Sequence, residues 1–237
     1  MVRKHIPNAI TSLNLASGCI AIVFAFQGEY TTASYFIALA AVFDFFDGFA
    51  ARLLKAYSPI GKELDSLADV VSFGVAPGMM LFNYVSDLSV QAYSLEYLAY
   101  LSFLIPVFSA LRLAKFNIDE RQTTSFIGLP TPANAIFWAF GISSNFTYAL
   151  DTQIDPLIIV AGILIFSWLL ISNIPMFSLK FKQYGWKGNR IRYYFLVGCI
   201  VLIALSGIAG LSACILWYIF LSVINARFDK KRINNKI

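Results

Sequence analysis

The sequence predicts an all-α membrane protein, a polytopic helical bundle of about eight transmembrane helices with both termini in the cytoplasm. Three observations support this fold class. Hydrophobic residues make up 59% of the 237 residues, and the mean hydropathy is +0.71. Charged residues make up only 13%, about half of the roughly 25% found in soluble domains. The apolar residues also gather in stretches near the length of about 20 residues that spans a bilayer as a helix.

Eight apolar stretches predict the helices in chain order. They cover residues 10–26, 32–54, 64–85, 97–114, 133–150, 156–174, 193–208 and 213–226. The last two are short and are separated by Gly207 and Gly210, so a re-entrant hairpin is the alternative there. No internal repeat or low-complexity linker interrupts the chain, which predicts a single domain over residues 1–237.

Charge placement agrees with eight helices. The basic residues all fall at the N-terminus, in three alternate loops with the adjoining helix ends, or in the basic tail 227–237. They are Arg3, Lys4, Arg52, Lys55, Lys62, Arg112, Lys115, Arg121, Lys180, Lys182, Lys187, Arg190, Arg192, Arg227, Lys230, Lys231, Arg232 and Lys236. The opposite loops carry only acids, namely Glu29, Asp87, Glu96, Asp151 and Asp155. Short basic loops stay on the cytoplasmic side, so we expect both termini there. The net charge of +5 then reflects topology and attraction to anionic lipid, not nucleic-acid binding.

Four aspartates stand out because carboxylates are unfavourable within apolar segments unless paired, hydrated or bound to metal. Asp44 and Asp47 lie three residues apart near the end of the second stretch, and Asp65 and Asp69 four apart in the third. Each pair therefore shares one helical face. A short connection through Ser58-Pro59 would make the two helices antiparallel neighbours, so that all four carboxylates can converge.

A divalent cation, or two, is the ordinary way to hold several carboxylates together, with oxygen ligands alone. The alternative is a charge cluster paired with Arg52, Lys55 and Lys62, although long basic side chains can reach the interface while short aspartates cannot. Gly48 and Gly61 would let a bulky ligand approach the backbone.

The segment from Asp44 to Asp69 resembles the signature of the CDP-alcohol phosphatidyltransferase family, D-x2-D-G-x2-A-R-x8-G-x3-D-x3-D. Every fixed position matches. These positions are Asp44, Asp47, Gly48, Ala51, Arg52, Gly61, Asp65 and Asp69.

The resemblance implies a reaction in which an alcohol attacks the β-phosphorus of a CDP-linked lipid and CMP leaves. It implies that Asp44, Asp47 and Asp65 bind metal, Mg²⁺ or Mn²⁺ and two ions per site, with Asp69 completing a second metal site or acting as base. The metal would stabilise charge on phosphoryl oxygens. The implied CDP-lipid-binding residues are Asn8, Thr11, Asp47, Gly48, Ala51, Arg52, Gly61 and Ser66. For Asn8 and Thr11, helix capping is the simpler alternative, and for Arg52, closure of the carboxylate network.

Four further segments resemble the phosphatidylserine synthase branch of that family. They are residues 6–18, 66–78, 110–117 with 128–135, and 172–180. This resemblance implies CDP-diacylglycerol and L-serine as substrates, phosphatidylserine and CMP as products, and a homodimer in the cell inner membrane with its active site facing the cytoplasm.

Serine needs a partner for its carboxylate. Arg112 is the candidate because a guanidinium binds a carboxylate through two parallel hydrogen bonds. Lys115 and Asn117 are further candidates for serine or phosphate binding. The alternatives are an interfacial anchor for Arg112 and Lys115 and a helix cap for Asn117.

Three other functions stay open at this point. The same family includes enzymes that use glycerol 3-phosphate or inositol phosphate as acceptor. Intramembrane acids also line ion pathways in cation transporters, but there the carboxylates sit near mid-membrane. A scaffold with a structural metal is the third, and it predicts no transferase activity.

Overall fold

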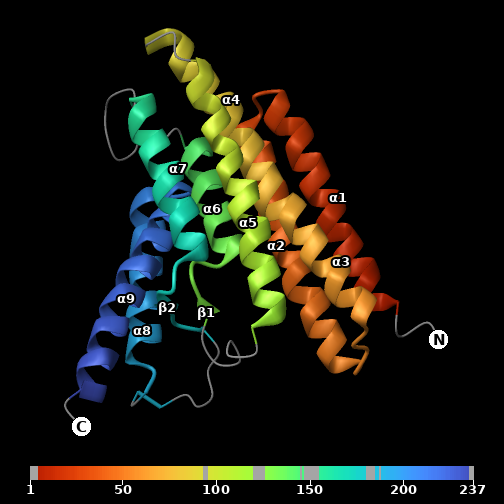
Figure 1. The fold of residues 1–237 in the computed structure, drawn as a ribbon, viewed down its shortest axis with the longest axis vertical. Coiled ribbons are helices and arrows are strands. Elements are labelled where there is room, and N and C mark those ends of the chain that lie inside the picture. The colour runs from red at the N-terminus through yellow and green to blue at the C-terminus, as the bar shows by residue number, and fades with distance from the viewer. Residues whose placement is uncertain are drawn as a thin grey trace.

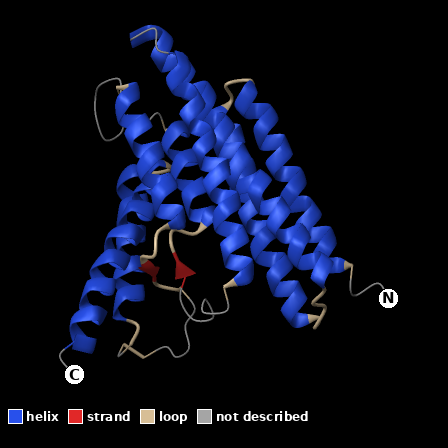
Figure 2. Ribbon diagram, in the orientation of Figure 1, coloured by secondary structure: helices blue, strands red, loops and turns tan. Residues whose placement is uncertain are grey.

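The computed structural model describes residues 5–92, 96–119, 126–144, 146, 155–179, 185–186 and 188–234. Within them the chain is almost entirely helical, which confirms the predicted fold class (Figure 2). The helices are α1 (Ile6–Phe26), α2 (Tyr30–Leu53), α3 (Pro59–Asp69), α4 (Ala76–Ala92), α5 (Leu104–Ile118), α6 (Thr131–Ser143), α7 (Pro156–Ile171), α8 (Arg190–Ser206) and α9 (Ala209–Asn234).

Two irregular helical segments join these helices into longer rods. The π-helical turn Val70–Val75 connects α3 to α4, and the 3₁₀ segment Glu96–Phe103 leads into α5. A two-stranded antiparallel ribbon, β1 (Phe126–Ile127) with β2 (Pro175–Met176), connects the end of α5 to the segment after α7. The sequence did not predict this ribbon.

With α3 and α4 counted as one rod, the helices run alternately up and down, so α1 begins and α9 ends at the same end of the bundle (Figure 1). Contacts at both ends confirm the alternation. At the end where α2 begins and α4 ends, Tyr30 Oη donates to Asp87 Oδ2 at 3.3 Å. At the other end, Lys62 Nζ at the start of α3 donates to the Asn117 carbonyl at the end of α5, at 2.9 Å. We call this second end the motif end.

The described basic side chains lie at the motif end, where α2, α5 and α9 finish and α3 and α8 start. They are Arg52, Lys55, Lys62, Arg112, Lys115, Arg190, Arg192 and Arg227. The acids Glu29, Asp87 and Asp155 lie at the opposite helix ends. The rest of the charge prediction concerns side chains outside the described part. These are Arg3, Lys4, Arg121, Lys180, Lys182, Lys187, Lys230, Lys231, Arg232, Lys236, Glu96 and Asp151.

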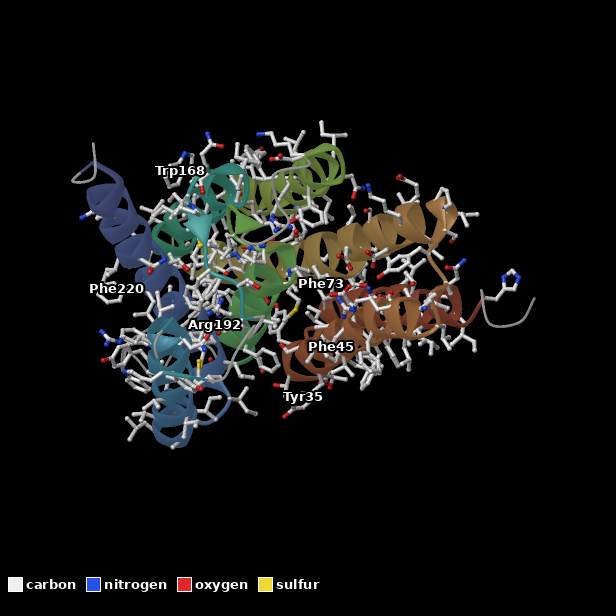
Figure 3. The ribbon with its side chains drawn as sticks, turned by 90° about the horizontal axis from the view of Figure 1, so that it is seen from below. Tyr35, Phe45, Phe73, Trp168, Arg192 and Phe220 are labelled. Carbon is white, nitrogen blue, oxygen red and sulfur yellow. The ribbon has the colours of Figure 1, made fainter. Side chains whose placement is uncertain are left out.

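Four helical segments of the described chain are long and apolar enough to cross a membrane, and the chain is a multi-pass membrane protein. These segments are Ile6–Phe26, Pro59–Leu88, Tyr97–Ile118 and Ala209–Arg227. Large apolar side chains on the outside of the bundle suit a lipid environment. Figure 3 shows Trp168 and Phe220 at the periphery, where both are more than half exposed, whereas Phe73 is fully buried between helices.

Some helix bounds differ from the predicted stretches. The third helix begins at Pro59, five residues before the predicted start, because the Ser58 hydroxyl caps its N-terminus by accepting from Gly61 N. The last helix continues to Asn234, beyond the apolar residues, because lysine and arginine are good helix formers. The fifth predicted stretch is shorter in the described residues, where α6 ends at Ser143.

The last two helices pack as an antiparallel pair. Gly207 turns the chain between them with a φ of +57°, a conformation that suits glycine. A Cβ added to Gly198 would lie 2.2 Å from Trp217 Nε1, so α8 and α9 approach closely there. α8 has 17 residues and α9 has 26.

Candidate active site

Three aspartates converge at the motif end of the bundle. Asp44 and Asp47 lie on α2 and Asp65 lies on α3, and each offers a carboxylate oxygen within 4.8 Å of the others. The sequence brings them together through the short turn after α2, where Lys55 adopts a φ of +51° and Ser58 starts α3. The predicted convergence of the two helices is therefore present for these three residues.

Asp69 lies one helical turn beyond Asp65, at the end of α3, and is only 7% exposed. Its carboxylate is close enough to those of Asp44 and Asp65 for their negative charges to repel. The π-helical turn Val70–Val75 starts directly after it. Such turns occur frequently at functional sites.

Helix α1 supplies polar partners to both aspartate pairs. Thr11 Oγ1 can donate to Asp47 Oδ2 at 2.6 Å or to the Pro7 carbonyl at 3.0 Å. Asn14 Nδ2 donates to Asp69 Oδ1 at 3.1 Å. Thr11 was predicted as a site residue and Asn14 was not. The signal that could have found Asn14 is its position three residues after Thr11, on the same face of the helix.

The two motif glycines differ in their surroundings. A Cβ added to Gly48 would meet nothing within 4 Å, so the backbone there borders open space. A Cβ added to Gly61 would lie 2.9 Å from both Asn8 Oδ1 and Ser58 Oγ. Gly61 therefore permits the close approach of α1 and α3.

The remaining predicted residues on α2 and α3 lie around this cluster. Ala51 is half-buried and the Arg52 side chain is exposed. Ser66 Oγ accepts a hydrogen bond from Asn117 Nδ2 at 2.8 Å, which joins α3 to α5 beside the contact of Lys62 with the Asn117 carbonyl. Asn117 thus holds α5 against the helix that carries Asp65 and Asp69.

Arg112 on α5 is buried, with 7% of its surface exposed. Its Nη1 donates to Thr131 Oγ1 at the start of α6, at 3.0 Å. Its charge is close enough to the Asp69 carboxylate for the two to attract. A buried arginine that faces the motif is a better candidate for ligand binding than for an interfacial anchor, because an anchor would keep its guanidinium in water.

A cavity of about 370 Å³ lies beside Arg112 at the motif end. Residues from the end of α5, from β1 and from the end of α7 line it. They are Arg112, Lys115, Phe116, Ile118, Asp119, Ile127, Leu170, Ile171, Ser172 and Asn173. The cavity therefore includes two of the three predicted acceptor residues, and the third, Asn117, lies on the same turn of α5.

The aspartates suit a divalent metal ion. Asp65 Oδ1 is buried and has no hydrogen-bond partner in the described part of the chain. A buried carboxylate oxygen without a partner is unfavourable unless an ion or water binds it. Carboxylate oxygens are also the ligands that Mg²⁺ and Mn²⁺ prefer. Asp44, Asp47 and Asp65 thus fit such an ion.

The sequence profile of the CDP-alcohol phosphatidyltransferase family matches residues 4–170, which is most of the chain and includes the whole motif. This chain belongs to the CDP-alcohol phosphatidyltransferase family. The family uses a divalent metal, in agreement with the three converging aspartates. The matched range runs from the start of α1 to within α7, so it contains every predicted site residue.

Relatives within the family carry related names. The chain is 37% identical over 75% of its length to a CDP-diacylglycerol–serine O-phosphatidyltransferase of Bacillus subtilis, of which it covers 92%. It is 31% identical over 76% of its length to the enzyme of the same name from Helicobacter pylori, of which it covers 74%. An archaetidylserine synthase of Methanothermobacter thermautotrophicus is 31% identical over 71% of this chain, which covers 68% of that relative.

Proposed function

We propose that this protein transfers the phosphatidyl group of CDP-diacylglycerol to L-serine and releases phosphatidylserine and CMP. The observation that carries the proposal is the convergence of Asp44, Asp47 and Asp65 in a member of a family whose similar relatives are named for this reaction. The buried Arg112 beside a cavity at the same end of the bundle supports an acceptor with a carboxylate.

In this reaction the serine hydroxyl oxygen forms a bond to the β-phosphorus, and the bond from that phosphorus to the bridging oxygen of CMP breaks. The metal, Mg²⁺ or Mn²⁺ with two ions per site, would supply charge stabilisation for the phosphoryl oxygens when bound by Asp44, Asp47 and Asp65. Asp69 accepts the hydroxyl proton. Its hydrogen bond from Asn14 fixes the carboxylate in place, as a general base requires.

The nucleotide of CDP-diacylglycerol lies between the starts of α1 and α3 and the end of α2. Gly48 supports this placement because its backbone borders open space. We assign CDP-lipid binding to the predicted set of Asn8, Thr11, Asp47, Gly48, Ala51, Arg52, Gly61 and Ser66. Asn8 and Thr11 come from the same turn of α1, and Thr11 also reaches the Asp47 carboxylate. The exposed Arg52 guanidinium is free to contact a phosphate.

Serine enters from the cavity beside Arg112. The guanidinium binds the serine carboxylate, and Lys115 adds positive charge to the cavity wall. Asn117, on the same turn of α5, supports the cavity wall by holding this turn against α3 through its bond to Ser66. In this arrangement the serine hydroxyl extends from Arg112 toward Asp69. The guanidinium of Arg112 and the carboxylate of Asp69 attract each other.

We further propose that the motif end faces the cytoplasm across the cell inner membrane, and that two copies form a homodimer there. The basic side chains at the motif end and the acids at the other end support this orientation. A soluble nucleotide and free serine would then reach the site from the cytosol, while the lipid chains enter from the bilayer.

Serine-dependent release of CMP from CDP-diacylglycerol by the purified protein tests the proposal. We expect turnover with L-serine and a divalent metal, and none with glycerol 3-phosphate or inositol phosphate. Turnover with either phosphate ester but not with serine would assign the protein to another acceptor. Release of CMP without a lipid product containing serine would also contradict the proposal.

A further inference from the structure

A buried polar cluster lies where α5 meets α6 and contains none of the four aspartates. Ser109 and Arg112 are three residues apart on α5, and Thr131 and Asn134 are three apart on α6, so each pair occupies one helical face. The hydrogen bond from Arg112 Nη1 to Thr131 Oγ1 brings these two faces together. We call these four residues the α5–α6 cluster.

Four side-chain polar atoms of the α5–α6 cluster have no hydrogen-bond partner in the described part of the chain. Ser109 and Asn134 are fully buried, yet Ser109 Oγ and both amide atoms of Asn134 make no hydrogen bond within the described chain. Arg112 Nε is likewise buried and has no hydrogen-bond partner among the residues that the structure describes. Buried polar groups in folded proteins are nearly always hydrogen-bonded to protein, water or ligand. Four such atoms on two adjoining helix faces therefore suit a bound ligand that would complete them.

The α5–α6 cluster adjoins both the motif and the cavity. A Cβ added to Gly74, five residues after Asp69, would lie 3.2 Å from Ser109 Cβ. Arg112 belongs to the cluster, lines the cavity and attracts the Asp69 carboxylate. Of the four cluster residues only Arg112 lines the cavity, so Arg112 connects a small polar molecule in the cavity with both the cluster and Asp69.

The unpartnered atoms match the two charged groups of a small amino acid. A carboxylate only accepts hydrogen bonds, and Arg112 Nε, Asn134 Nδ2 and Ser109 Oγ can each donate one. An ammonium only donates, and Asn134 Oδ1 can accept from it. A phosphate ester such as glycerol 3-phosphate has no cationic group that would use the Asn134 Oδ1 acceptor.

We propose that Ser109 and Asn134 bind the α-amino acid acceptor together with Arg112, and that Asn134 selects for its ammonium group. This inference rests on the proposed function, because it names further residues that recognise the acceptor of that reaction. Asn134 Oδ1 accepts from the ammonium, while Ser109 and Arg112 donate to the carboxylate. Neither Ser109 nor Asn134 lies in the aspartate motif.

The test uses the full chain in lipid nanodiscs and compares Asn134→Leu and Ser109→Ala with two controls. Asn83→Leu removes a partly buried amide on α4 that donates to the Ala25 carbonyl at 2.7 Å, far from the motif end. Ser167→Ala removes a buried hydroxyl on α7 that, like Ser109, has no partner among the described residues. Each control makes the same chemical change outside the α5–α6 cluster.

We expect the KM for L-serine to rise by about tenfold or more in Asn134→Leu and Ser109→Ala. The KM for CDP-diacylglycerol should stay within about twofold of the wild-type value, because the nucleotide site is separate. Both controls should keep the wild-type KM for serine. A second measurement is independent of turnover: L-serine should raise the melting temperature of the wild type and of both controls, but not of Asn134→Leu.

The preference between two acceptors is a further readout. This preference would not change if Asn134 had only a structural role. Relative to L-serine, 3-hydroxypropionate lacks the ammonium, so its disadvantage as an acceptor should shrink in Asn134→Leu. An unchanged KM for serine in both variants, with wild-type preference between these acceptors, would overturn the inference while leaving the proposed function intact. Absence of serine-dependent CMP release by the wild type would instead overturn the proposed function, and this inference with it.

Discussion

Asn14 Nδ2 donates a hydrogen bond of 3.1 Å to Asp69 Oδ1 and so connects α1 to the last aspartate of the motif. The backbone carbonyl of Asn14 also accepts from Ser72 Oγ in the π-helical turn, at 3.0 Å. One residue of α1 therefore holds both Asp69 and the turn that follows it. Asn14 is fully buried, so its amide has no access to water as an alternative partner.

Replacing Asn14 by leucine should lower kcat without an equal rise in the KM for either substrate. The change removes the donor that fixes the Asp69 carboxylate, and general-base catalysis contributes about 10²- to 10⁴-fold to rate. Initial rates of CMP release measure the effect. Ser12→Ala is the control on the same helix, because Ser12 is exposed and, among the described residues, its hydroxyl donates only to the Asn8 carbonyl. A wild-type kcat in Asn14→Leu would contradict this role.

Replacing Thr11 by valine should raise the metal concentration needed for half-maximal activity. The hydroxyl of Thr11 is within 2.6 Å of Asp47 Oδ2, and valine keeps its shape without a donor. Loss of one such bond to a charged group costs about 1.5–3 kcal/mol. Titration of Mg²⁺ or Mn²⁺ against CMP release measures the change. Thr11→Ser restores a hydroxyl and should recover most of the wild-type metal response, whereas an equal defect in both variants would argue against the hydrogen bond.

Asparagine in place of Asp44 or Asp65 should abolish activity, since each removes one of three converging carboxylates. A chelator should likewise stop the wild-type enzyme, and added Mg²⁺ or Mn²⁺ should restart it. Asp87→Asn makes the same change at the opposite end of the bundle, where Asp87 contacts Tyr30, and should remain active. If Asp65→Asn kept full activity, and kept it in the presence of the chelator, this result would exclude a metal role for the Asp65 carboxylate.

Alanine substitutions at the two motif glycines should have different effects: Gly61→Ala should lower the stability of the protein, and Gly48→Ala should weaken substrate binding. Gly61→Ala places a methyl group 2.9 Å from Asn8 Oδ1 and Ser58 Oγ, so we expect a loss of about 1–3 kcal/mol in stability. Gly48→Ala adds a methyl group to open space and should leave the melting temperature unchanged. If Gly48 borders the nucleotide, the Gly48→Ala variant should have a higher KM for CDP-diacylglycerol than the wild type. Equal melting temperatures for the two variants would contradict the close packing at Gly61.

The sequence predicted the helices and the convergence of the aspartates well because both depend on local spacing. Apolar length predicts a helix, and residues three or four apart share a face. The ribbon of β1 and β2 escaped prediction because each strand has two residues, too few for a periodic pattern. A proline and a glycine near these strands indicate a turn but do not specify which segments pair.

The partners of polar residues on other helices were harder to predict. Asn14 and Asn134 are single amides in apolar helices. The spacing of Asn14 from Thr11 indicates that the two share a helix face, but no sequence spacing indicates which residue of another helix lies across from either asparagine. Their significance depends on packing between helices, which places Asn14 beside Asp69 and Asn134 beside the face that carries Arg112. The roles proposed for Arg52, Lys115 and Asn117 remain predictions.

The π-helical turn Val70–Val75 has a consequence for insertions and deletions in this chain. An α-helix turns about 100° per residue, and a π-helical turn accommodates one extra residue within a continuous rod. Deleting one residue between 70 and 75 would therefore convert this rod to regular α-helix instead of breaking it. Met80 and Leu81, which are fully buried after the turn, would therefore remain buried, because the deletion would change the helix only within the turn. Deleting Phe45 or Phe46 in α2 would instead leave Asp44 and Asp47 two residues apart, about 200° around the helix, and would separate the two carboxylates.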